Sequence, residues 1–304
     1  MLKSHKQRTV ARTITCSGIG VHSGKKVNLT IRPAHANHGI RFARTDLPHT
    51  PVIAALFNQV VDTSLATVIG SGGCIVSTIE HLMAAFSGLS IDNVRVELDA
   101  YEMPIMDGSA RPFFERLQKA GFEEQTARRH FFVIKDPVEL DDGDRFVGVY
   151  PAGTRKFTCT VAYDHPLIRK QSITIDLNEQ VFAEHVCAAR TFGFLQDVEK
   201  MKRFGLGRGG SLDNVVVVGR AGIVNPEGLR FEDEFVRHKV LDCIGDFSLL
   251  GMPILGHIVT HKSGHAFNLA FLDKLFNAKD AWFTSTQPAY PVSSPANIQE
   301  ALAI

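Results

Sequence analysis

The sequence is poor in cysteine and tryptophan, with five cysteines and one tryptophan among 304 residues. The cysteines are odd in number and scattered, and no two of them form a CxxC pair. This pattern argues against a disulfide framework and against a zinc site built from cysteines. It favours reduced thiols in a cytosol, so we expect a cytoplasmic protein.

Long apolar runs and a strong excess of charge are also absent. No run reaches the length of a membrane span, and the charged N-terminus has no apolar signal-peptide core. The net charge of +1 argues against a general nucleic-acid-binding surface. Apolar residues make up 44% of the chain, which is enough for ordinary cores, and the length predicts about two domains. We expect a soluble monomer without a transmembrane segment.

A helix with one buried face is predicted around His238. Apolar residues recur at helical spacing from Val240 to Phe247, and the acidic residues 232–234 stand where the first turn should begin. His238 and Asp242 are four residues apart, so their side chains emerge on the same face. A surface ion pair is the ordinary interpretation, but the two side chains can also reach one divalent cation.

A similar segment lies upstream, around His81. Residues 77–89 again have helical spacing, and aligning His81 with His238 places Gly88 on Gly245. A glycine turn and a second helix follow at matching positions in both segments. The chain is therefore interpreted as two copies of one unit, made of a helix with an exposed histidine, a strand, a glycine turn and a helix.

The two copies differ at positions that matter for metal binding. Asp242 stands where the first copy has Ala85, and His265 stands where it has Ser109. Polar groups have thus gathered in the second copy, opposite the histidine of the first. Three protein ligands with an open fourth position are typical of a catalytic rather than a structural zinc. The predicted ligands, from both halves, are His81, His238 and Asp242.

Five sequence motifs together resemble one known family. They are STIEHLMAAFSGL, PIMDGSA, ARTFGF, GLRFEDEFVRHKVLD and HKSGHA. All five, in this order, are similar to the zinc-dependent UDP-3-O-acyl-N-acetylglucosamine deacetylases of bacterial lipid A synthesis. The resemblance runs from about Val10 to about Ala281, nearly the whole chain. It implies a hydrolase that removes the N-acetyl group of UDP-3-O-acyl-N-acetylglucosamine, giving acetate and a free amine.

The expected fold is α+β, with two pseudo-symmetric domains. Each is a β-sheet covered by two helices, and the helix layers pack face to face in a β-α-α-β sandwich. The polar segment 123–129 marks the boundary between a domain of residues 1–126 and a domain of residues 127–304. A segment at about 189–219 has no counterpart in the first copy and is interpreted as an inserted acyl channel. The proline-rich tail from Thr284 is expected to be irregular.

Glu80 has two interpretations. Ser77 and Glu80 have the spacing of a capping box, in which Glu80 would only close the start of its helix. Alternatively, beside the ligand His81, Glu80 is a general base. The residues alone divide these interpretations evenly, and the family resemblance favours the base, which takes a proton from the attacking water.

The resemblance also implies roles for four other residues. His265, otherwise a solvated loop histidine, would be a cation that stabilises the oxyanion and protonates the leaving amine. Asp246, otherwise a charge on the helix face, would orient His265. The Thr191 hydroxyl would help to hold the oxyanion. Lys239, otherwise extended along the surface, would border the site and bind the nucleotide.

The acyl chain and the nucleotide of such a substrate need separate contacts. An acyl chain needs a dry channel, for which the inserted segment offers apolar side chains. Two positions, Tyr163 and Arg145, depart from the residues expected in the family. The full set of expected substrate-binding residues is Phe192, Phe194, Val198, Gly210, Ser211, Leu212, Val215, Lys239, Tyr163 and Arg145.

Two other classes of protein stay open. Two histidines and one carboxylate are also the ligands of non-haem iron oxygenases, so Fe²⁺ is an alternative to one catalytic Zn²⁺. The protein could instead be a sugar-nucleotide or lipid-binding module with a structural metal. A structural zinc would normally have four protein ligands, and the sequence offers three.

Overall fold

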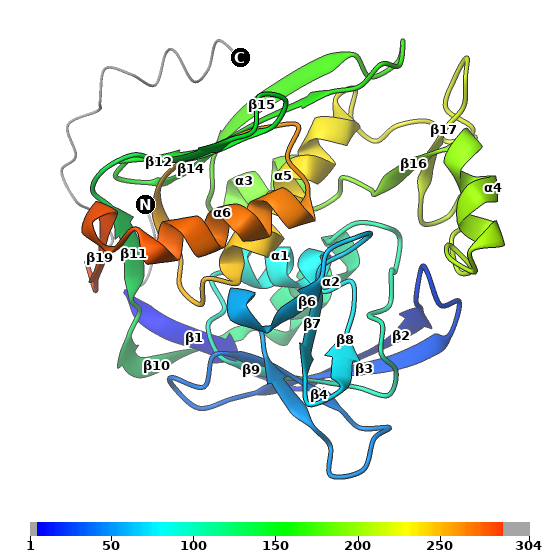
Figure 1. The fold of residues 1–304 in the computed structure, drawn as a ribbon. Coiled ribbons are helices and arrows are strands. Elements are labelled where there is room, and N and C mark those ends of the chain that lie inside the picture. Colours follow the sequence, from blue (N-terminus) through cyan, green and yellow to red (C-terminus); the bar gives the residue numbers. More distant parts are fainter. Residues whose placement is uncertain (1–4, 288–304) are drawn as a thin grey trace.

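The computed structural model describes residues 5–287, apart from the side chains of Glu199 and Lys202. Within this part of the chain, helices and strands alternate in a mixed fold, as the α+β prediction requires (Figure 1). The tail is ordered further than expected, because Thr284 belongs to the strand β19 (Trp282–Ser285), which pairs with an earlier strand. The prolines of the tail lie outside the described residues.

The first half of the chain forms a sheet whose strands alternate between buried and exposed side chains. In β3, for example, Val27, Leu29 and Ile31 are buried and alternate with polar residues, which is the period of a strand with one face in a core. The strands of this sheet, in spatial order, are β2 (Ile14–Ile19), β3 (Lys26–Pro33), β9 (Val94–Leu98), β4 (Ile40–Arg44) and β5 (Val52–Ala54). A smaller sheet consists of β6 (Val60–Asp62), β7 (Val68–Ser71) and β8 (Cys74–Val76).

The second half builds a larger mixed sheet around one central strand. β18 pairs antiparallel with β13 and parallel with both β14 and β11. A turn at residues 142–144, which the sequence Asp142-Gly143-Asp144 favours, joins β12 and β13, with Gly143 in the left-handed region at φ 90°. The strands are β11 (Phe131–Ile134), β12 (Val138–Asp141), β13 (Phe146–Tyr150), β14 (Arg155–Ala162), β15 (Lys170–Asp176), β18 (Ile254–His261) and β19.

Helices fill the space between these two sheets. Figure 1 shows α1 and α5 near the centre, with the blue strands of the first sheet below them and the green strands of the second above. The helices are α1 (Glu80–Gly88), α2 (Arg111–Ala120), α5 (Glu234–Ser248) and α6 (His265–Asn277). None of the helices within residues 5–287 is long and apolar enough to cross a membrane.

α1 and α5 pack directly on each other, and Gly245 makes this close approach possible. A Cβ atom at Gly245 would lie 2.2 Å from the backbone oxygen of Glu80, so no side chain fits there. The contact brings the first turn of α1 against the C-terminal half of α5. His81 and His238, expected to be exposed on their own helices, are therefore buried between them.

The polar segment expected to separate two domains is itself a strand. β10 (Phe122–Arg128) pairs antiparallel with β1 (Lys6–Val10), and so joins the N-terminal strand to the middle of the chain. The expected boundary at residue 126 falls inside β10. The division into two domains stays a prediction.

The inserted segment contains a helix, a glycine turn and a short apolar strand, β17 (Val216–Val218). Gly205 and Gly207 adopt left-handed φ angles of 72° and 65° in the turn. A second strand, β16 (Phe192–Phe194), pairs in parallel with β17, and the segment lies at the right of Figure 1. Its elements are β16, α4 (Leu195–Arg203) and β17, preceded by the short helix α3 (Glu179–Val181) and the π-helical turn η2 (Phe182–Val186). Single 3₁₀ turns occur at η1 (Phe57–Gln59) and η3 (Lys279–Ala281).

Candidate metal centre

The three predicted ligands meet where α1 crosses α5. Their donor atoms lie within 4.8 Å of one another, and all three side chains are buried. Asp242 Oδ1 is 3.3 Å from His238 Nε2 and 3.7 Å from His81 Nε2. The spacing of four residues on α5 accounts for the first contact, and the packing of α1 on α5 accounts for the second.

One oxygen of Asp242 marks where a cation would bind. Oδ2 accepts a hydrogen bond from Lys239 Nζ at 2.8 Å, whereas Oδ1 is buried and has no hydrogen-bond donor. A buried carboxylate oxygen without a partner is costly, and a metal ion would compensate it. Two imidazole nitrogens and one carboxylate oxygen are donors that suit Zn²⁺ or Fe²⁺. The residues therefore fit a divalent metal.

Both histidines have the protonation state that a ligand needs. Burial lowers the pKa of His81 to about 3, helped by repulsion from His238, and burial also lowers the pKa of His238. His238 Nδ1 lies 3.1 Å from the carbonyl oxygen of Ala189. This contact assigns the ring proton to Nδ1 and leaves Nε2 free to bind a metal.

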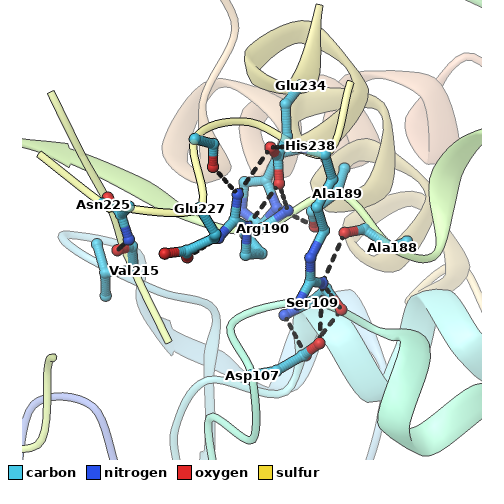
Figure 2. Close-up of polar contacts among 12 residues, drawn as sticks. Asp107, Ser109, Ala188, Ala189, Arg190, Val215, Asn225, Glu227, Glu234 and His238 are labelled. Carbon is cyan, nitrogen blue, oxygen red and sulfur yellow. Dashed lines mark hydrogen bonds and ion pairs between the residues drawn. The ribbon is translucent and has the colours of Figure 1, made fainter. Parts of the chain in front are cut away.

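The loop that carries Ala189 is fixed to the start of α5 by Arg190 (Figure 2). The guanidinium donates to Glu234 and Glu227, at 2.9 and 2.6 Å, and to the carbonyl oxygen of Gly228 at 2.7 Å. Arg190 and Glu234 are both buried. Because α5 begins at Glu234, this ion pair sets the position of the loop relative to the ligands on the same helix.

Glu80 is the first residue of α1, but it does not form a capping box. The Ser77 N–H donates to the carbonyl oxygen of Tyr101 at 2.8 Å, and Thr78 has a left-handed φ of 63°. Glu80 instead accepts from the Thr67 N–H at 3.1 Å. The capping interpretation is therefore wrong, because a bond to a distant part of the chain takes the Ser77 donor.

The environment of Glu80 suits a general base. Burial raises its pKa to about 7; the positive charge of His265 opposes this shift, and the negative charge of Asp242 adds to it. An acid with a pKa near neutrality can both accept and release a proton at physiological pH.

His265 begins α6 and contacts Asp246, as the sequence analysis expected. Its Nδ1 is 2.8 Å from Asp246 Oδ2, and that oxygen also accepts from Asn268 at 2.8 Å. Burial by itself would lower the pKa of His265, but the charges of Asp246, Glu80 and Asp242 outweigh it and raise the pKa to about 10. The imidazole is therefore a cation at neutral pH.

A cavity of about 540 Å³ leads from this centre into the inserted segment. Glu80, His265 and the three ligand residues line one end of the cavity, and side chains of β16, α4 and β17 line the other. The predicted residues that line it are Thr191, Phe192, Phe194, Val198, Gly210, Ser211, Leu212, Val215, Tyr163 and Lys239.

Arg145 is the predicted substrate residue that does not line this cavity. It lies in the turn between β12 and β13, where it pairs with Asp142 at 2.5 Å and stacks over the ring of Phe267 at 4.7 Å from its centroid. A local ion pair within the turn holds the side chain away from the cavity. The assignment of Arg145 as a substrate contact is thus not supported by its position.

Comparison with known proteins identifies the family. The family model described as "LpxC: UDP-3-O-acyl N-acetylglycosamine deacetylase" matches residues 7–277. The chain belongs to the LpxC family.

Three relatives in the LpxC family illustrate how close the match is. Each is named UDP-3-O-acyl-N-acetylglucosamine deacetylase. The protein from Myxococcus xanthus (strain DK1622) is 51% identical over 274 residues, which are 90% of this chain and 87% of the relative. The one from Syntrophus aciditrophicus (strain SB) is 44% identical over 280 residues, 92% and 89% of the two chains. The one from Citrifermentans bemidjiense is 45% identical over 292 residues, 96% of each chain.

The sequence analysis missed three polar residues that lie at the site of this LpxC family member. His22 lines the cavity in a loop whose His22 and Ser23 N–H groups both donate to the carboxylate of Glu102 at 2.8 Å. The sequence feature that could have identified His22 is its position within a glycine-rich loop. Thr67 and Asn268, which both donate to Asp246, lie outside the five motifs and carry no signal of their own.

Proposed function

We propose that this protein is a metal-dependent deacetylase that hydrolyses the N-acetyl group of UDP-3-O-acyl-N-acetylglucosamine in lipid A biosynthesis. One observation carries the proposal. The buried, unpartnered Oδ1 of Asp242 faces two neutral imidazoles at the end of the cavity that Glu80 and His265 also line. Membership of the LpxC family and the names of the relatives agree with it.

His81, His238 and Asp242 would hold one Zn²⁺, with Fe²⁺ as the alternative because it accepts the same donors. When bound, the metal would lower the pKa of a water molecule and polarise the acetamide carbonyl. The chain contributes the orientation of the ligands, through Ala189 on His238 and Lys239 on Asp242.

Glu80 and His265 would handle the protons of the reaction. The Glu80 carboxylate accepts a proton from the attacking water, since burial has raised its pKa to about 7. His265, kept cationic by Asp246, stabilises negative charge on the carbonyl oxygen and donates a proton to the leaving nitrogen. The Thr191 hydroxyl, at the wall of the same cavity, donates to that oxygen.

The rest of the cavity would position the substrate. Phe192, Phe194, Val198, Leu212 and Val215 supply apolar walls for the acyl chain on the inserted segment. Gly210, Ser211, Tyr163 and Lys239 would meet the sugar nucleotide. Lys239 suits this role because its ammonium lies at the cavity wall, between Asp242 and the ring of Phe192.

We further propose a two-domain β-α-α-β sandwich, with the metal centre between residues 1–126 and 127–304. The same order of helix, strand, glycine turn and helix in both halves supports this division. All the proposed ligands and proton-transfer residues come from one chain, which supports a monomer. All five cysteines are free thiols, which supports a reducing, cytoplasmic location.

The test is acetate release from UDP-3-O-acyl-N-acetylglucosamine by purified protein. We expect a chelator to abolish turnover and one equivalent of Zn²⁺ or Fe²⁺ to restore it. Repeating the assay without oxygen separates hydrolysis from oxygenase chemistry, because hydrolysis consumes no O₂. Full turnover by metal-free protein would refute the metal assignment, and specific binding without acetate release would favour the binding-module alternative.

A further inference from the structure

A second cavity, separate from the candidate metal centre, lies at the other end of the helix pair. It has a volume of about 170 Å³ and lies between the sheet strands β4 and β5 on one side and β14, α5 and the loop after α5 on the other. Most of its wall is apolar. The buried side chains of this wall include Phe157, Ile244, Phe247 and Ile258.

One buried cation lies in the wall of this second cavity. Arg155 is 8% exposed, and its guanidinium donates two hydrogen bonds, both to Ser87 at the end of α1, at 3.1 and 2.6 Å. Its Nε is buried and has no acceptor. Among the described residues, no carboxylate lies within ion-pair distance of Arg155. A buried charge without a counter-ion is costly, so such residues are usually paired.

The other charged groups around the second cavity leave it positive. Asp92 lies in the wall, but both of its oxygens are already used by Arg129 and by the backbone N–H of Arg8. Arg41, a second cation, also lines the cavity. Burial and the neighbouring Arg129 lower the pKa of Arg155 to about 10, against the attraction of Asp92, so Arg155 stays charged at neutral pH.

We propose that the second cavity binds a small organic carboxylate, whose charge pairs with Arg155 and whose apolar body fills the space between Phe157 and Phe247. A planar carboxylate matches the donor geometry of a guanidinium. The volume is close to that of an engineered cavity of ~150 Å³ that holds benzene, so the body has about six carbons. Inorganic phosphate would leave the apolar wall uncovered, and an alcohol of the same size would leave the charge unpaired.

Such a ligand would contact residues from both halves of the chain at once. Ser87 belongs to α1 in the first half of the chain and Arg155 to β14 in the second, and Ile244 and Phe247 belong to the helix that carries His238 and Asp242. A ligand that binds only the folded state stabilises it by mass action. Occupation of the second cavity is therefore expected to raise the melting temperature.

Calorimetric titration with hexanoate or benzoate tests this site. We expect saturable binding of one equivalent, with a rise in melting temperature, and binding at least tenfold weaker for 1-hexanol and for inorganic phosphate at equal ionic strength. The same carboxylates could also bind at the metal centre. The titration is therefore repeated with Asp242→Ala, in which the expected binding survives. Loss of binding in that variant, or no saturable binding to the wild type, overturns the proposal.

Variants in the second cavity complete the test. Arg155→Met keeps an unbranched apolar stem and removes the guanidinium and its charge, and it should weaken carboxylate binding at least tenfold. Ala55→Leu fills part of the apolar wall and should weaken binding even if Arg155→Met does not fold. Arg116→Gln, on the exposed face of α2, is the matched control and should bind as the wild type does. Unchanged binding in both cavity variants would place the ligand elsewhere.

Discussion

Arg190 and Glu234 form an ion pair in which each side chain is almost fully buried, at 2% and 1% exposure. The pair connects the loop that holds Ala189 and Thr191 to the first residue of α5. A contact about one helical turn from the proposed metal ligands therefore fixes both the carbonyl that orients His238 and the hydroxyl proposed to bind the oxyanion. The ion pair acts as a positioning contact for the metal centre.

Glu234→Gln should destabilise the protein strongly. Removing one partner of a buried ion pair typically costs about 3–5 kcal/mol, because the other charge stays buried. The loss of unfolding free energy should lie toward the lower end of this range, because Glu227 still pairs with Arg190. Urea unfolding measures the change, and Glu115→Gln, in the exposed pair with Arg111, is the control with a loss below about 1 kcal/mol. Equal losses in the two variants would contradict the positioning role.

Asp242→Ala should remove the metal. It recreates Ala85 of the first copy, and two histidines without a carboxylate make a poorer site. We expect metal content, measured by atomic emission after dialysis, to fall well below one equivalent and turnover to be lost. Full metal content together with full turnover would show that Asp242 is not a ligand.

Glu80→Gln should separate rate from stability. The glutamine oxygen can still accept the Thr67 N–H, so melting temperature and metal content should stay near those of the wild type. Loss of the proton acceptor should reduce kcat by about two orders of magnitude or more, the usual range for a general base. A variant that melts early and keeps most of its rate would assign Glu80 a structural role.

The pH profile of kcat/KM should be bell-shaped. Glu80 must be deprotonated to accept a proton, so activity should rise through a pKa of about 7. His265 must be protonated to donate one, so activity should fall through a pKa of about 10. A bound dication lowers the pKa values of both Glu80 and His265. Because the two groups are coupled, neither limb of the profile belongs to one residue alone. In Glu80→Gln the acid limb of the profile should flatten or move. In His265→Ala the basic limb should do so. His265→Ala should also lose about as much rate as Glu80→Gln while keeping its metal.

The acyl chain should contribute strongly to kcat/KM. Each buried CH₂ contributes roughly 0.8 kcal/mol, so a long chain in the cavity of the inserted segment is worth several kcal/mol after ordering losses. A UDP sugar without the acyl chain should therefore be a much poorer substrate. Competition assays with both substrates measure the ratio, and equal turnover would refute the acyl channel.

The sequence predicted those features that depend on local periodicity. The spacing of His238 and Asp242, the apolar faces of α1 and α5, and the turn at Gly143 all follow from a few neighbouring residues. The repeat supplied the one long-range prediction, that His81 faces α5, because two similar units can pack helix against helix.

Other features depend on contacts that no local pattern encodes. Ser77 and Glu80 have capping-box spacing, but the Ser77 N–H is taken by Tyr101 and α1 starts differently. Arg145 was predicted to contact the nucleotide, but its side chain pairs with Asp142 in the turn between β12 and β13. Thr67 reaches Asp246 from a distant segment, and only the folded chain brings the two side chains together.

The placement of the proposed ligands also bears on when the protein could acquire a metal during synthesis. His81 leaves the ribosome long before His238 and Asp242, and alone it is one imidazole without a second donor. The 3.7 Å contact between His81 and Asp242 exists only once α5 has been made and has docked on α1. If the proposed ligands are correct, a nascent chain would complete its metal site only at this last stage of synthesis.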